Sequence, residues 1–238
     1  MARTTLTADV QESIKQLILE RGLAPGSPLP PEGELAELFD VSRVSLREAL
    51  KALQALQVIE IRRGSGTFVG SLSLDPFVKG LAFRAAVRHR NGEPSLYELM
   101  RVREALEAGL IESVAASVPE EDLEALRGIV ADMEKEAEAG RVARATDRAF
   151  HVALYRSLDN YLLSEVLDAF WAAMDQVRDD VGDSHQVGAI TAAHHKAIVE
   201  ALAAGDGPRA AAAMRTHFDG IRERLAPGGV AAAARPVG

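Results

Sequence analysis

Apolar residues recur with a helical period along most of the chain, and a short alternating stretch interrupts them before residue 70. This first part predicts three helices, at residues 9–21, 32–39 and 43–57. Gly22 ends the first helix, a loop with four prolines precedes the second, and Ser42 caps the third. Residues 58–61 and 67–69 predict two strands joined by a tight turn.

Beyond residue 76 the period is almost entirely helical. The predicted helices span residues 76–90, 96–117, 120–138, 142–158, 161–181, 187–204 and 207–225. Short segments rich in Gly, Pro, Asn and Asp separate them. The fold class is therefore mainly α, with an N-terminal three-helix and β-pair domain before an antiparallel all-helical bundle of about seven helices. The predicted boundaries are residues 1–70 for the first domain, 71–76 for a linker, 77–225 for the bundle and 226–238 for a disordered tail.

The composition restricts the compartment and the chemistry that can be expected for this chain. The 238 residues contain no Cys, which excludes disulfides, thiolate nucleophiles and Cys-ligated metal sites. Charged residues interrupt every apolar stretch, so neither a signal peptide nor a membrane span is expected, and we expect a cytoplasmic protein. The net charge of −8 argues against nucleic acid only superficially, because the first 70 residues hold eight basic and nine acidic side chains.

The second and third predicted helices form a helix-turn-helix, and the β pair that follows makes it a winged one. Arg43 and Arg47 lie four residues apart near the start of the recognition helix, where arginine contacts guanine through O6 and N7. Further DNA contacts are expected from two serines of the same helix start and from the tip of the wing, namely Ser42, Ser45, Arg63 and Gly64. The alternative is that the two helix arginines are solvated and pair with Glu34 or Glu48.

Residues 6–69 resemble the winged helix of the GntR family of bacterial regulators. The resemblance rests on Leu29-Pro-Pro-Glu32, Glu34-Leu-Ala36, Val41-Ser-Arg43, Leu46-Arg-Glu-Ala-Leu50 and Gly64-Ser-Gly-Thr-Phe-Val69. It implies base contacts by Arg43 and Arg47 and an approach of Gly64 to the minor groove. The chain departs from the family at Gly33, where members usually carry a basic residue that contacts DNA, and at Pro31, which replaces the common Ser.

Four polar residues of the bundle form a candidate metal site: Asp147, His151, His195 and His217. Asp147 and His151 are four residues apart and share a helix face, and each histidine falls on the apolar side of its predicted helix. Three imidazoles and one carboxylate suit zinc, nickel, cobalt or manganese, with zinc preferred. Taken singly, each histidine could also be an ordinary core or surface residue, and Asp147 with His151 a simple intrahelical pair.

The C-terminal region resembles the FCD ligand-binding domain of the FadR subfamily. The matching segments are Leu96–Arg101, Leu106-Glu107, Asp147-Arg-Ala-Phe-His151, His195-Lys-Ala-Ile198, Ala201-Leu202, Gly205-Asp206, Met214 and His217. The resemblance implies a divalent metal held by one Asp and three His, and a small organic acid as effector. It also implies effector contacts by Arg101, with Arg103 and Asn160 as further candidates, whereas His185 and His194 are expected at the surface.

Three hypotheses follow for the whole chain. The leading one is a metabolite-responsive transcriptional repressor that binds a palindromic operator as a homodimer and whose DNA affinity depends on the acid at the metal. A direct metal sensor is the second. A metal-dependent hydrolase is the third, and it is disfavoured because the sequence offers no general base or transition-state stabiliser for it. We therefore expect no enzymatic activity.

Overall fold

A computed structural model describes residues 2–176 and 188–226, apart from the side chains of residues 2–6 and 224. The chain divides into two compact units, Met1–Phe77 and Val78–Gly238, so the division falls within the first turn of the helix that begins at Asp75. The predicted tail lies almost wholly outside the described residues. Among the described helices, none is long and apolar enough to cross a membrane.

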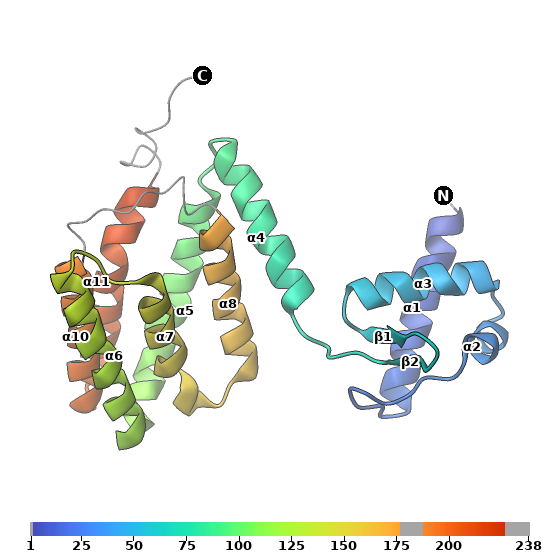
Figure 1. Cartoon of the computed structure of the whole chain (residues 1–238), viewed down its shortest axis with the longest axis horizontal. Helices are drawn as coiled ribbons and strands as arrows, with labels where there is room; N and C mark the ends of the chain where they lie inside the picture. Colours follow the sequence, from blue (N-terminus) through green and yellow to red (C-terminus); the bar gives the residue numbers. More distant parts are fainter. Residues whose placement is uncertain (1, 177–187, 227–238) are drawn as a thin grey trace. The chain divides into compact units, whose positions relative to one another are not determined.

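The first unit contains three helices and two strands (Figure 1). They are α1 (Ala2–Glu20), α2 (Glu32–Leu38), α3 (Arg43–Ala55), β1 (Ile59–Arg62) and β2 (Gly66–Val69). The predicted elements are present, but α1 starts seven residues earlier than predicted because no Gly or Pro precedes Asp9 to stop it. Gly22 ends α1 at a φ of +57°, and the Ser42 side chain caps α3 by accepting from the Ser45 N–H at 3.1 Å.

A small apolar core joins the helices of this unit to the wing. Its fully buried members come from all three helices and from both strands: Val10, Ile14, Leu35, Leu46, Leu50, Leu53, Ile59 and Val69. β1 and β2 pair antiparallel, with Ile59 opposite Val69 and Arg62 opposite Gly66. At Gly70 a Cβ would lie 2.3 Å from the backbone oxygen of Gln57, so only glycine lets the strand leave the wing at this point.

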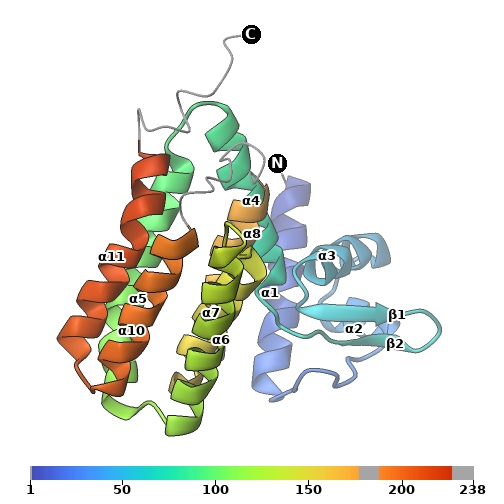
Figure 2. The same cartoon turned by 60° about the vertical axis from the view of Figure 1, so that its left-hand side comes forward.

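Within the second unit the described residues form seven α-helices. They are α4 (Asp75–Arg90), α5 (Ser95–Ser117), α6 (Glu120–Glu138), α7 (Arg144–Leu154), α8 (Tyr161–Gln176), α10 (Gly188–Ala203) and α11 (Gly207–Leu225). α11 packs against α5, and α10 packs against α11, as the turned view in Figure 2 shows. α6 packs against both α10 and α7. The predicted mainly α fold with a helical second domain is confirmed.

The predicted helix at 142–158 was wrong in one respect. α7 ends at Leu154, and a separate turn of 3-10 helix, η1 (Arg156–Leu158), follows it. The apolar period continues through the break, which is why the pattern predicts one helix. The buried Tyr155 hydroxyl donates to the backbone oxygen of Glu107 at 3.0 Å, and this contact holds the chain at the bend.

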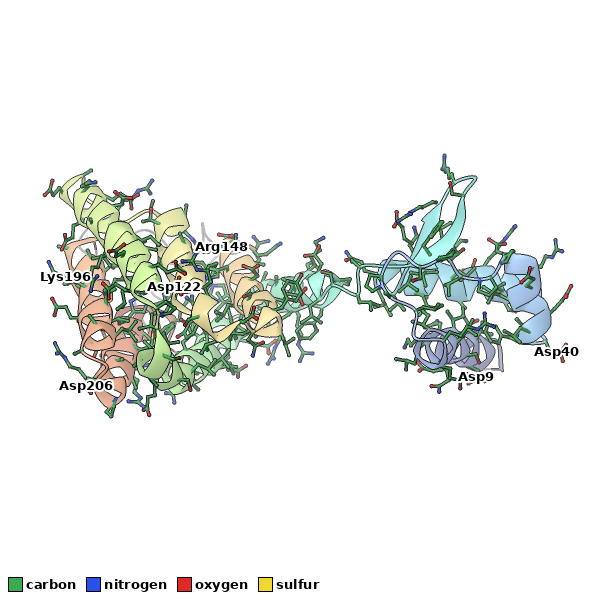
Figure 3. All side chains as sticks on the ribbon, turned by 90° about the horizontal axis from the view of Figure 1, so that it is seen from below. Asp9, Asp40, Asp122, Arg148, Lys196 and Asp206 are labelled. Atoms are coloured by element: carbon green, nitrogen blue, oxygen red, sulfur yellow. The ribbon has the colours of Figure 1, made fainter. Side chains whose placement is uncertain are left out.

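The bundle has a large apolar core with a few polar side chains inside it. Surface charges point outward, as the labelled Lys196 and Asp206 of the bundle and Asp9 and Asp40 of the first unit illustrate in Figure 3. By contrast, the buried polar and charged residues of the bundle are Ser95, Arg103, Glu107, Asp122, His151 and His195. Burying a charge costs free energy unless the charge is paired or binds a ligand, so these residues mark the centre of the bundle as a candidate site.

Candidate metal centre and DNA-contacting face

Three helices of the bundle bring the four predicted metal ligands together. α7 supplies Asp147 and His151, α10 supplies His195 and α11 supplies His217, and one ligand atom from each lies within 4.8 Å of all the others. His151 Nε2 lies 3.2 Å from His217 Nε2 and 3.7 Å from Asp147 Oδ1. His195 Nε2 lies 2.9 Å from the same carboxylate oxygen.

These separations fit a shared divalent cation. Zinc–nitrogen bonds of about 2.0–2.1 Å place two ligand atoms roughly 2.9 Å apart at a right angle and roughly 3.3 Å apart at the tetrahedral angle, so the separations also suit a metal with a further open position. Asp147 Oδ1 and His195 Nε2 are buried atoms that make no hydrogen bond among the described residues, although they lie close together. Buried polar atoms that converge without pairing are costly as they stand, and a metal ion would satisfy them.

A second layer of contacts orients two of the histidines. Glu107 Oε2 lies 2.5 Å from His151 Nδ1, and the backbone oxygen of Thr191 lies 2.7 Å from His195 Nδ1. A carboxylate and a carbonyl can only accept, so each Nδ1 carries the proton and each Nε2 presents its lone pair to the cluster. His217 Nδ1 is buried and has no partner among the described residues.

The electrostatics of the cluster favour the protonation states that a metal requires. Burial lowers the pKa of His151, and it lowers the pKa of His217 further because His195 and His151 lie beside it. Burial opposes the charged form of Asp147, but the contact with His195 and the nearby imidazoles outweighs burial and holds the pKa of this carboxyl well below its usual range. Neutral imidazoles and an ionised carboxylate are the forms that bind cations.

A buried arginine completes the centre. Arg103 is 4% exposed, and its guanidinium carbon lies 4.5 Å from the ring centroid of Trp171 and 5.2 Å from that of Phe218. Its Nε donates to Glu107 Oε1 at 2.6 Å, while its Nη2 is buried without a partner among the described residues. Burial would raise the pKa of Glu107, but the interactions with His151 and Arg103, hydrogen bonds included, outweigh burial and lower it to about 2. The guanidinium therefore keeps one free donor for an anion.

The two residues predicted first for the effector, Arg101 and Asn160, are both exposed. The Arg101 side chain is 58% exposed, and its nearest acidic partner is Glu104, at 3.9 Å. Asn160 is exposed, and its side chain caps α8 by accepting from the Leu163 N–H at 3.1 Å. Arg103, one of the further candidates, is the arginine that lies beside the cluster.

Glu107 and Trp171, which also lie at this centre, were not among the predicted site residues. A usable signal was present for the first of them, because Arg103 and Glu107 are four residues apart and an apolar run follows them directly. Such a pair on the inner face of a helix is buried with its charges, and a buried ion pair is unusual enough to mark a site.

In the first unit the start of α3 presents an exposed face. Arg43, Val44 and Arg47 are exposed, and Val44 is 61% exposed although it is apolar. Arg47 Nε donates to Glu32 Oε2 at 2.8 Å, so the predicted alternative partners Glu34 and Glu48 are not the ones it uses. This contact uses only Nε, so it does not occupy the two terminal nitrogens of the Arg47 guanidinium, which are the pair that contacts a guanine end-on.

The remaining predicted DNA contacts lie at the start of α3 and at the tip of the wing. Ser42 and Ser45 are engaged with each other, with their hydroxyl oxygens 2.9 Å apart. Gly64 turns the wing with a φ of +76°, a conformation that favours glycine, and Arg63 beside it is exposed. Arg62 is held by Glu60 at 2.8 Å and lies over the Phe68 ring, so it stiffens the wing.

Each of the two units matches a known protein family. Residues 6–69 match the gntR family of bacterial regulatory proteins, and residues 98–220 match the FCD domain. The Uxu operon transcriptional regulator of Escherichia coli is 29% identical over 91% of this chain and 85% of its own length. The HTH-type transcriptional regulator Rv0494 of Mycobacterium tuberculosis is 32% identical over 91% of this chain and 88% of its own.

A solved structure agrees with these matches. GntR from Streptococcus agalactiae is 27% identical, with a TM-score of 0.60, and the match covers 91% of this chain and 98% of that one. The domains and the relatives are those of transcriptional regulators and not of enzymes. The chain belongs to the GntR family of bacterial transcriptional regulators, and it joins the DNA-binding domain of that family to an FCD domain.

Proposed function

We propose that the protein is a metabolite-responsive repressor that binds a palindromic operator as a homodimer, in the cytoplasm, and that a small organic acid bound at a divalent metal modulates its DNA affinity. The observation that carries this proposal is the centre of the bundle. Four ligand atoms lie within 4.8 Å of one another, beside a buried guanidinium with an unpaired nitrogen. The resemblance to the FadR subfamily implies seven helices in the effector domain, and the described residues of the second unit form seven.

Zinc is the metal that we propose first. Three imidazoles and a carboxylate form a borderline donor set that also suits nickel, cobalt and manganese. The metal would be held by Asp147, His151, His195 and His217, and when bound it would supply a positive charge and a coordination position for an acid. The chain itself supplies the burial that excludes water and strengthens these interactions.

Arg103 is the residue that we propose as the counter-charge for the acid. It is buried, it lies near His151 and His217, and its Nη2 has no partner among the described residues. A charge-assisted bond from Nη2 to a carboxylate would satisfy that donor. The buried Nε1 of Trp171 also lacks a partner among the described residues and could donate to a hydroxyl or carboxylate of the acid. The exposed Arg101 is a weaker candidate on these grounds.

The first helix of the bundle offers a surface for the homodimer. Phe83 is 65% exposed and Val87 is 42% exposed, and they lie one turn apart on α4. Large apolar side chains that share an exposed helix face are typical of subunit interfaces. We propose that a second copy of the chain covers this face, since a palindromic site needs two-fold symmetry in the protein.

The test is a DNA-binding titration with metal and acid varied independently. A duplex selected by the wild-type protein from a randomised library is titrated with chelator-treated and zinc-loaded protein, with and without a panel of carboxylic acids. We expect an acid that changes the dissociation constant for DNA only when zinc is present. Zinc alone producing the full change would identify a direct metal sensor instead.

A matched pair of variants then tests the arginine. Arg103→Gln should abolish the response to the acid while zinc content and acid-free DNA binding stay near wild type. Arg101→Gln removes the same charge from the same helix at an exposed position, and it should leave the response unchanged. The opposite pattern would return the role to Arg101.

A further inference from the structure

One fully buried carboxylate touches both parts of the proposed effector site. Glu107 lies on α5 and is 0% exposed. Its Oε1 accepts from Arg103 Nε at 2.6 Å, and its Oε2 accepts from His151 Nδ1 at 2.5 Å. Its backbone oxygen accepts from the Tyr155 hydroxyl at 3.0 Å, which fixes α5 against the end of α7.

Each oxygen of the Glu107 carboxylate orients a different residue. The bond to His151 keeps the proton on Nδ1, so Nε2 is available 3.2 Å from His217 Nε2. The bond to Arg103 occupies Nε, holds the guanidinium over the Trp171 ring and leaves Nη2 unpaired. Neither residue could keep this orientation through its own helix alone, because both side chains are long or rotatable.

We propose that Glu107 is a positioning residue that couples the metal to the acid. The proposal rests on the proposed function above and adds to it. One carboxylate fixes the tautomer of a metal ligand and the direction of the anion-binding arginine, so a change in the hydrogen bond on one oxygen alters the bond on the other. An imidazole whose Nε2 is coordinated is a stronger donor at Nδ1. The stronger bond takes up more of the negative charge of the carboxylate at His151. The positive charge of Arg103 is then less compensated while the bond to Nε still sets its direction, so metal and acid should bind with positive cooperativity.

Glu107→Gln is the informative substitution. An amide of the same shape has one acceptor oxygen and one donor NH₂, so it cannot accept from both Arg103 Nε and His151 Nδ1. If its NH₂ faces the histidine, the proton must move to Nε2 and the lone pair is lost from the cluster. Loss of such a partner weakens metal binding about 10- to 100-fold, and we expect a rise of that size in the zinc dissociation constant.

The matched control is Glu104→Gln. Glu104 lies three residues earlier on the same helix and also accepts from an arginine, Arg222, at 2.6 Å, but no contact with a histidine is described for it. This variant should keep wild-type zinc affinity. Zinc binding is measured by competition with a coloured chelator, and acid binding by calorimetry on protein with and without zinc.

The cooperativity gives a second readout that a purely structural role would not change. In the wild type, zinc should tighten binding of the acid at least tenfold, and in Glu107→Gln protein saturated with zinc this gain should shrink to the part that direct coordination of the acid supplies. Wild-type zinc affinity and wild-type cooperativity in a folded Glu107→Gln variant would overturn the coupling and leave the proposed function intact. A wild-type protein that binds no metal, or no acid, would overturn the proposed function itself.

Nitrogen NMR of the wild-type imidazoles provides a test that needs no variant. In the metal-free protein, His151 should carry its proton on Nδ1 with a downfield-shifted resonance that marks a strong hydrogen bond. A proton on Nε2 would overturn the proposal even if Glu107→Gln failed to fold.

Discussion

Replacing Gly33 with arginine should strengthen DNA binding, because this position lacks a basic residue that the family usually has. Gly33 is the second residue of α2, next to the Glu32 that holds Arg47. A Cβ built on Gly33 meets no heavy atom within 4 Å, and its φ is not in the left-handed region. The backbone and the surroundings therefore accept any side chain, so the missing contact can be restored without strain.

Two separate magnitudes follow from this geometry. Replacing Gly33 with a good helix former such as alanine or arginine should stabilise the first unit by about 0.5–1 kcal/mol, since glycine is the poorest helix former after proline. A new phosphate contact steepens the logarithmic salt dependence of DNA affinity by about 0.9, and by about 1.8 for a dimer with two such contacts. At 0.15 M salt the second figure corresponds to a gain in affinity of roughly 30-fold.

Fluorescence anisotropy at four salt concentrations separates the two effects. Gly33→Ala is the matched control, because it should give the same rise in thermal stability with an unchanged salt slope. Gly33→Glu should lower DNA affinity and flatten the slope. A salt slope for Gly33→Arg equal to that of Gly33→Ala would show that α2 does not approach the phosphates in this chain, and the reasoning from the family pattern would fail here.

Three further outcomes are expected. The paired His151→Ala and His217→Ala protein should purify without stoichiometric metal yet keep its helical circular dichroism, because the core around it is mainly apolar; one equivalent of metal by elemental analysis would mean that other residues are the ligands. Metal-free wild type should lose stability as the pH falls below about 6.5, at up to roughly 1.4 kcal/mol per pH unit for each of these two histidines. The reason is that the unfolded chain takes up protons there, whereas the folded chain, in which the histidine pKa values are lowered, does not. This contribution is fully present above pH 6.5, and a thermal unfolding midpoint that stays constant between pH 7 and pH 5 would contradict it. Val44→Ala should weaken the preference for thymine over uracil at one position of the selected duplex, because an exposed apolar side chain at the start of the recognition helix is suited to contact a thymine methyl. Equal sensitivity of both proteins to the dT→dU change would place Val44 away from the bases.

The helix pattern was predictable where the chain itself contains the stop signals. The predicted helices at 120–138 and 207–225 agree with α6 and α11 because Pro119 and Gly140 flank the first and Gly205 and Pro208 mark the start of the second. The break after Leu154 was not predictable in the same way, since no Gly or Pro marks it. A contact with the backbone of Glu107, 48 positions from Tyr155 in the sequence, holds the chain at that bend, and a periodicity argument does not include contacts of that range.

The four metal ligands were chosen from spacing, apolar helix faces and family resemblance, and the bundle does bring them together. The arginine was harder to choose, because Arg101 and Arg103 are only two residues apart and lie about 200° apart around a helix. A family pattern defines the helix, but which side of it faces inward depends on the packing of α5 against α8 and α11. Trp171 and Phe218, which lie on those two helices, enclose Arg103 and leave Arg101 exposed.

The cost of the polar centre is itself an argument for its function. A bundle of this size could fill the same space with apolar side chains, and replacing buried charges by apolar groups is often neutral or stabilising. Instead, Arg103 Nη2, Trp171 Nε1 and His217 Nδ1 are buried without partners among the described residues, and each such atom costs about 1–3 kcal/mol. Arg103 Nη2 and Trp171 Nε1 are donors, and both side chains lie close to His151, one of the four clustered residues. An anion bound at a cation in the cluster would accept from these donors and bind the metal as well, so we propose an organic acid, and not the metal alone, as the effector.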